Sequence, residues 1–117
     1  MEKEYNRSSF VKSFVESLGF SIVRPDLYEK KINWCSKFRA EYRDYSRSLI
    51  FTYFISLGVK CDGLEEVAYA HYKISYFDLC NLVDIDGKNH LKRIMLDMVN
   101  KAHNEILFNN NDATNQV

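Results

Sequence analysis

The fold of this chain is decided by residues 49–57, which read LIFTYFISL. Apolar side chains occupy almost every position, and only Thr52 and Ser56 interrupt the run. A segment that is apolar on all sides is typical of an element buried at the centre of a domain. We predict a central helix that ends at Gly58. The β-branched and aromatic residues also fit a buried strand, and the pattern alone does not decide between the two.

Two segments nearer the ends of the chain have clear helical periodicity. The first begins at Ser8 or Ser9 and runs to about Leu18, and Gly19 follows it as a glycine follows many helices. The second has apolar residues at positions i, i+3, i+4, i+7, i+8, i+11 and i+15, which predicts one amphipathic helix. Its apolar positions are Leu91, Ile94, Met95, Met98, Val99, Ala102 and Ile106.

The segment between these regions also reads as helical. Pro25 followed by Asp26 is a good helix start, and we predict a helix from there to about Arg47. Its apolar face falls at spacings close to multiples of 3.6. That face comprises Trp34, Phe38, Tyr42 and Tyr45.

Two further helix starts lie in the second half of the chain. Asp62 is followed three residues later by Glu65, and Ser75 is followed by Asp78, both in the manner of a capping box. The sequence therefore predicts an all-α fold, a compact bundle of about five to six helices with a possible short extended segment near residues 20–24. We expect a single domain over residues 1–108 and a disordered tail over residues 109–117.

Length and composition limit the class of protein. A chain of 117 residues fits one domain, and its net formal charge is zero. No apolar run reaches the roughly 18–20 residues of a membrane span, and the N-terminus lacks an apolar signal core, so we expect a cytoplasmic protein without a membrane partner. Cys35, Cys61 and Cys80 are odd in number and far apart, which favours free thiols over disulfides or a zinc site.

No motif for catalysis, cofactor or metal is apparent. The Asp-rich turn that begins at Asp84 differs from a calcium loop, because its glycine is fourth rather than sixth and its twelfth residue is Met95. The three histidines lack metal-ligand spacing, and the chain has neither a nucleophile elbow nor a phosphate-binding glycine loop. We therefore expect no enzyme activity, no cofactor and no metal. Those histidines are His71, His90 and His103.

Cations gather in the first half of the chain. Residues 1–60 carry eleven Lys or Arg and seven Asp or Glu, and Arg39, Arg43 and Arg47 recur every four residues. This row is interpreted as a solvated helix face or, alternatively, as a patch for RNA, phosphate or an acidic protein. A helix-turn-helix reading of residues 64–83 is weak, because its recognition helix would contain Asp78 and no Lys or Arg. We therefore do not expect nucleic acid as the partner.

Acids gather in the second half, between residues 62 and 86, where the net charge is −5. Tyrosines and Phe77 are interleaved with them. Carboxylates attract Arg and Lys, and tyrosine rings supply rigid contact area, so the stretch is a candidate surface for a basic protein. The alternative is that the aromatics are core and the acids solvate helix starts. The candidate residues are Asp62, Glu65, Glu66, Tyr69, Tyr72, Tyr76, Asp78, Asp84 and Asp86.

With this acidic, tyrosine-bearing stretch, the small size and the lack of motifs, the chain resembles bacterial toxin immunity proteins, such as those against colicins or contact-dependent growth inhibition toxins. The resemblance is of general character, and no family motif matches residue by residue. It implies a non-enzymatic cytoplasmic antagonist that occludes the active or substrate-binding surface of a cognate toxin domain, expected to be a basic nuclease. The alternatives are a small nucleic-acid-binding regulator that uses the arginine row and a structural or adaptor subunit. The sequence gives no oligomeric state.

Overall fold

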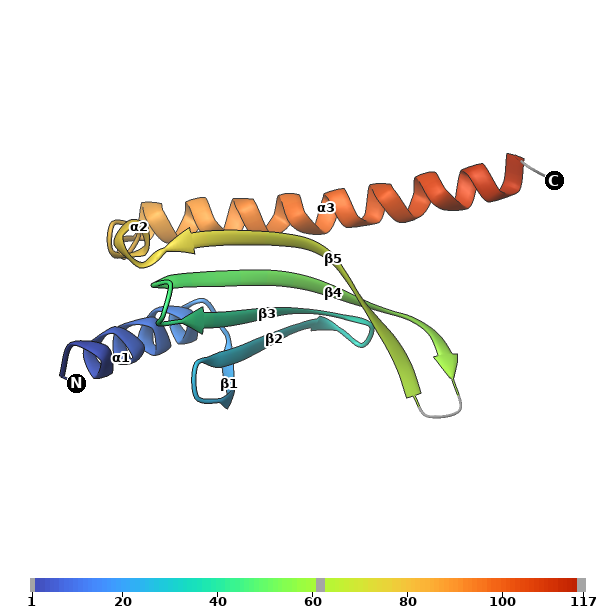
Figure 1. Ribbon diagram of the computed structural model, residues 1–117. Coiled ribbons are helices and arrows are strands. Elements are labelled where there is room, and N and C mark those ends of the chain that lie inside the picture. The colour runs from blue at the N-terminus through green and yellow to red at the C-terminus, as the bar shows by residue number, and fades with distance from the viewer. Residues whose placement is uncertain (1, 61–62, 116–117) are drawn as a thin grey trace.

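The computed structural model describes the backbone of residues 2–60 and 63–115, and the side chains of residues 7–56 and 66–105. A five-stranded antiparallel sheet with strand order β1-β2-β3-β4-β5 forms one layer, and helices form the other (Figure 1). The strands are β1 (Ser21–Arg24), β2 (Leu27–Asn33), β3 (Ser36–Arg43), β4 (Ser48–Lys60) and β5 (Gly63–Ser75). The helices are α1 (Glu2–Ser17), α2 (Tyr76–Cys80) and α3 (Ile85–Asn115).

Strand β4 contains the apolar run and lies between β3 and β5. Its odd-numbered side chains from Leu49 to Ile55 are buried on the face that the helices cover. The even-numbered ones, from Ser48 to Ser56, lie on the opposite face, where Ile50 and Phe54 are only partly buried. The run is therefore a strand with one fully buried face, and its apolar even positions pack beneath charged side chains of the neighbouring strands.

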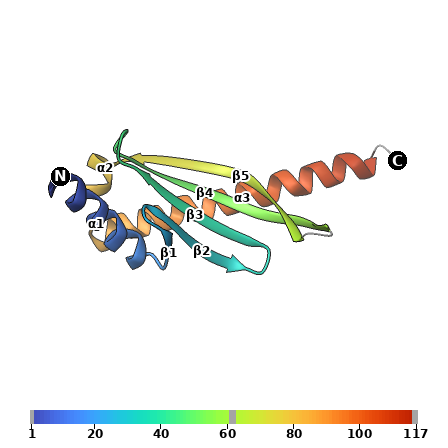
Figure 2. The same ribbon diagram turned by 60° about the horizontal axis from the view of Figure 1, so that its bottom comes forward.

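The core fills the space between the sheet and two helices. α1 lies near β1 and β3, and α3 runs along β5 (Figures 1 and 2). One cluster of buried side chains joins both helices to strands β2 to β5. The helices contribute Val11, Phe14, Val15, Leu18, Leu91, Met95, Met98 and Ala102, and the strands contribute Tyr28, Phe38, Ala40, Tyr42, Leu49, Phe51, Tyr53, Ile55 and Ile74.

Short turns connect the first four strands. Arg24 pairs with Leu27, so Pro25 and Asp26 form a two-residue turn, and Asp26 has a φ of 64°. A proline before a residue with positive φ is typical of a type II turn. Pro25 therefore begins a turn and not the predicted helix.

The predicted all-α bundle is wrong. Pro25–Arg47 forms two strands and their turns, and the region predicted as a helix after Asp62 is β5. A spacing of four explains the error, because Phe38 and Tyr42 share a face in a strand as well as in a helix. Ser36 before them and Ala40 between them are also buried, which reveals the strand's period of two.

Other predictions agree with the structure in part. The helix that precedes Gly19, the extended segment near residues 20–24 and the helix over residues 91–106 are confirmed, and Gly19 has a φ of 94°. The start predicted for the first helix at Ser8 or Ser9 is wrong, because α1 begins at Glu2. The central helix predicted for residues 49–57 is wrong, and the strand alternative is confirmed, because alternate side chains of this run are buried on one face of β4. The helix α3 extends to Asn115, into the segment that is expected from the sequence to be a disordered tail.

A polar latch ties α1 to the turn between β3 and β4. The Arg7 guanidinium donates two hydrogen bonds to the Asp44 carboxylate, at 2.9 and 3.3 Å, and the Tyr42 hydroxyl donates a third at 2.8 Å. The hydrogen bonds from Arg7 and then Tyr42 lower the pKa of Asp44 below its ordinary value of 3.8. Burial, with the adjacent Asp44 carboxylate, raises the pKa of Tyr42 to about 12.

We predict that Phe51→Ala lowers the free energy of unfolding by about 3–5 kcal/mol, because its ring is fully buried in the core. Phe54→Ala should cost about 1–2 kcal/mol, since its ring is half-buried on the other face. Urea unfolding of both variants measures the difference. Equal, large losses would contradict the strand, because they are what a helix buried on all sides predicts.

We predict that Asp44→Asn lowers the unfolding midpoint at neutral pH and that its gap from the wild type closes in acid. A carboxyl whose folded pKa is depressed stabilises the fold above its ordinary pKa, and this contribution is lost as the pH falls through the folded value. Thermal unfolding from pH 7 to pH 2 measures the gap. Glu105→Gln, on an exposed side chain, is the control. A gap that does not change with pH would rule out the latch as its source.

Candidate functional site

The end of β5, the helix α2 and the start of α3 form a corner of the molecule (Figure 1). The Ser75 hydroxyl accepts a hydrogen bond from the backbone N–H of Asp78 at 3.1 Å, which confirms the predicted cap of α2. The Asp84 carboxylate accepts one from the N–H of Gly87 at 2.7 Å and caps α3. These two caps fix the backbone of residues 77–86, which we call the acidic corner.

The acidic corner exposes apolar side chains beside carboxylates. The exposed fractions are 76% for Phe77 and 75% for Ile85, and Val83 is 46% exposed. The three aspartates in the corner are also exposed, and residues 77–86 contain no Lys or Arg. Large apolar side chains that are exposed beside several carboxylates are typical of a binding surface rather than of a solvated helix face. The three aspartates are Asp78, Asp84 and Asp86.

The predicted tyrosines are packed rather than exposed. Tyr76 contacts Phe10 edge to face, with ring centroids 5.6 Å apart, and Tyr42 at 6.3 Å. Tyr69 and Tyr72 are half-buried and pack against the core. The bulge at Tyr69, where the pairing of β4 with β5 shifts, lets two tyrosines three residues apart both approach the core.

A groove runs between β5 and α3. It lies farther along these two elements than the acidic corner. Its volume is about 440 Å³. Partly buried apolar side chains line it together with His71, Asp97 and Lys101. The groove thus lies along the strand that leads into the corner and the helix that leaves it. Its other lining residues are Tyr69, Ala70, Tyr72, Ile94 and Met98.

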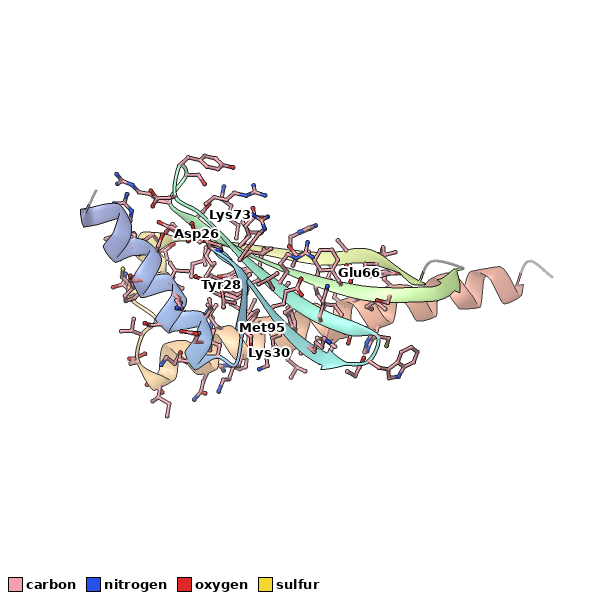
Figure 3. The ribbon with its side chains drawn as sticks, turned by 90° about the horizontal axis from the view of Figure 1, so that it is seen from below. Asp26, Tyr28, Lys30, Glu66, Lys73 and Met95 are labelled. Carbon is pink, nitrogen blue, oxygen red and sulfur yellow. The ribbon has the colours of Figure 1, made fainter. Side chains whose placement is uncertain are left out.

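The remaining predicted acids do not join the corner. Glu66 lies toward the other end of β5, as Figure 3 shows by the separation of its label from Lys73, and its carboxylate is 2.8 Å from the ammonium of Lys37. Asp62 lies outside the described residues, and the side chain of Glu65 is not described either. The net charge of the 62–86 stretch is thus divided between two ends of a strand.

The predicted arginine row lies on the outer face of the sheet and in a turn. Arg39 donates to Glu29 at 3.0 Å and stacks over the ring of Phe54, with 4.6 Å between the guanidinium carbon and the ring centroid. Arg43 donates to Glu41 at 2.7 Å, and Arg47 lies in the β3–β4 turn with a φ of 48°. Two of the three arginines therefore already have a carboxylate partner.

Lys37 extends this ion-pair network across the sheet. Its ammonium lies 3.3 Å from Glu29 and 2.8 Å from Glu66, and so reaches across β4 to β5. Although burial works to raise it, hydrogen bonds from Arg39 and Lys37 leave the pKa of Glu29 below its ordinary value. The outer face is a network of paired charges, which reduces its attraction for an external polyanion.

Within the described residues, no three His, Cys, Asp or Glu side chains lie close enough together to hold a metal ion. No described helix is long and apolar enough to cross a membrane. Comparison of the chain with protein-family models, with curated proteins and with solved structures finds no match.

The sequence pattern does not single out the apolar members of the corner. Phe77 is noted among the aromatic residues of the acidic stretch but is not a candidate site residue, and no local signal shows that Val83 and Ile85 are exposed. One signal was available: Phe77 directly follows a capped helix start and precedes Asp78, a position on the outer side of a short first turn. The groove residues on α3 could not be selected without knowing that β5 lies beside that helix.

We predict that Gly87→Ala disrupts the acidic corner. A Cβ at this position would lie 2.4 Å from the Cα of Leu82, a backbone atom that cannot move without displacing the loop between α2 and α3. We expect a loss of about 2–3 kcal/mol in unfolding free energy, in the range of overpacked sites. Urea unfolding and amide exchange of residues 77–88 measure it. A variant with wild-type stability and exchange would show that the loop is not held against α3.

Proposed function

We propose that this chain is a non-enzymatic protein-binding antagonist of the toxin-immunity kind, which acts in the cytoplasm by covering the working surface of a basic toxin domain, such as a nuclease. The acidic corner is the proposed contact. The tyrosines predicted from the sequence serve mainly as its support, and Phe77 takes their place as the exposed ring.

The observation that supports this proposal is the exposure of Phe77 and Ile85 among three aspartates. Carboxylates attract a basic partner from a distance and set its orientation, whereas desolvated aromatic and aliphatic groups hold it once bound. The corner carries both kinds of group on a backbone fixed by two helix caps. A preformed surface loses little conformational entropy on binding.

The groove between β5 and α3 supports the proposal further. It lies farther along the two elements that flank the corner and offers apolar side chains, so a partner that covers the corner and continues along α3 would reach it. Nucleic-acid binding is supported less, because Arg39 and Arg43 are paired with Glu29 and Glu41 on the sheet.

We predict that the double variant Asp78→Lys/Asp86→Lys slows association with the partner about tenfold or more at low salt, because long-range attraction becomes repulsion. Phe77→Ala should instead speed dissociation about tenfold, as truncation of a central anchor does. Asp84 is left intact because it caps α3. The partner is the product of the neighbouring toxin-bearing gene or the protein recovered from native lysate, and surface plasmon resonance gives both rates.

The matched control for charge is Glu16→Lys/Glu105→Lys, which changes net charge equally at two exposed sites outside the corner. The control for apolar area is Leu96→Ala, on a side chain that is 58% exposed. Both controls should bind and protect cells as the wild type does. If the corner variants fold and protect equally well, the corner is not the working surface.

A further inference from the structure

A second exposed aromatic group stands at the tip of the β2–β3 hairpin. Trp34 is 83% exposed, which is rare for the largest apolar side chain. The turn that carries it is firmly held: the side-chain oxygen of Asn33 accepts hydrogen bonds from the backbone N–H of Cys35 at 2.9 Å and from the Ser36 hydroxyl at 3.0 Å. The carbonyl of Cys35 accepts a 2.7 Å hydrogen bond from the N–H of Ser56 on β4. The turn thus holds Trp34 out in solvent.

The surroundings of Trp34 combine apolar and cationic groups. Ile32 is 43% exposed, and the side chain of Lys31 is exposed as well. Lys31 and Trp34 border a depression of about 360 Å³ on the same tip, whose far wall is the ion pair of Lys37 with Glu66. This is the chemistry that the acidic corner is proposed to bind: a fixed apolar ring next to a cation.

The tip and the corner lie at opposite ends of the sheet. Ser36, at the tip, pairs with Ile55 on β4, whereas Ser75, which leads into the corner, pairs with Ser48. These two partners lie seven positions apart on β4, about 23 Å at the rise of a strand. A paired sheet does not fold back on itself over that length, so the tip and the corner of one chain do not meet.

We propose that the Trp34 tip of one chain binds the acidic corner of a second copy, so that the protein associates head to tail. The tip supplies Trp34, Ile32 and Lys31, and the corner supplies Phe77, Ile85 and its three aspartates. The two surfaces are complementary in charge and alike in apolar character. The inference rests on the corner being a binding surface, as proposed above, but not on the identity of any toxin.

The contact has two physical consequences. Because the two surfaces differ, the contact is heterologous, and each added copy leaves one tip and one corner free. Because it involves one hairpin tip and one corner, we expect it to bury less than the roughly 1,200 Å² of a stable complex and to form only at high protein concentration. A tightly bound toxin would displace the tip from the corner.

The test uses two variants of the full chain that each lack one surface, Trp34→Ala and Phe77→Ala. Both side chains are exposed, so both variants should fold, which circular dichroism checks. In sedimentation velocity at rising concentration, the wild type should gain mass beyond a dimer, and each variant should stay monomeric with at least about tenfold weaker association. An equimolar mixture of the two variants should form a capped dimer and nothing larger. Leu96→Ala is the control and should associate like the wild type.

Trp34 is the only tryptophan in the chain, so its fluorescence reports its own burial. Emission should shift to shorter wavelength as the wild type is concentrated, and the shift should be absent in Phe77→Ala. A wild type that stays monomeric with unshifted emission, or a mixture of variants that does not pair, would overturn the proposal. Toxin binding by Trp34→Ala tests the antagonist function separately, because that variant keeps the corner and lacks the tip.

Discussion

The burial of alternate side chains on β4 is the constraint on which the rest of the structure depends. Leu49, Phe51, Tyr53 and Ile55 point into the core, and their burial sets the register of β3 on one side and β5 on the other. A slip of one residue would turn these four side chains to the outer face, so the register is strongly specified. The position of the Trp34 tip, the start of α2 and the line of contact with α3 all follow from that register.

The same register explains why the outer face carries charges rather than a second helix layer. With the core on one side, the even positions of β4 and the odd positions of β3 lie on the outer face. An ion-pair network spans this face from β2 to β5, formed by Glu29, Lys37, Arg39 and Glu66. The Arg39 guanidinium covers the ring of Phe54 on β4. Long side chains with apolar stems shield the partly buried groups of β4 from water.

Local sequence predicted the two terminal helices, because their apolar residues repeat at three and four, which no strand reproduces. It could not assign residues 34–47, because Phe38 and Tyr42 are four apart and fit either period, while Trp34 and Tyr45 are 83% and 84% exposed in turns and belong to no buried face. Within the acidic stretch it selected the tyrosines, which pack against the core, and not Phe77, which is exposed. Whether Tyr76 faces solvent or Phe10 depends on α1, some 66 residues away in the chain, and no local pattern contains that information.

The order of the strands has a consequence for synthesis on the ribosome. Each strand pairs with the one made immediately before it, so the whole sheet can assemble as the chain emerges, with only short loops to close. The core face of that sheet, with Phe38, Phe51 and Tyr53, nevertheless lacks half of its cover until Leu91 to Ala102 have been made. During that interval the nascent chain displays a wide apolar sheet, which is the period when it is most prone to aggregation and most in need of a chaperone.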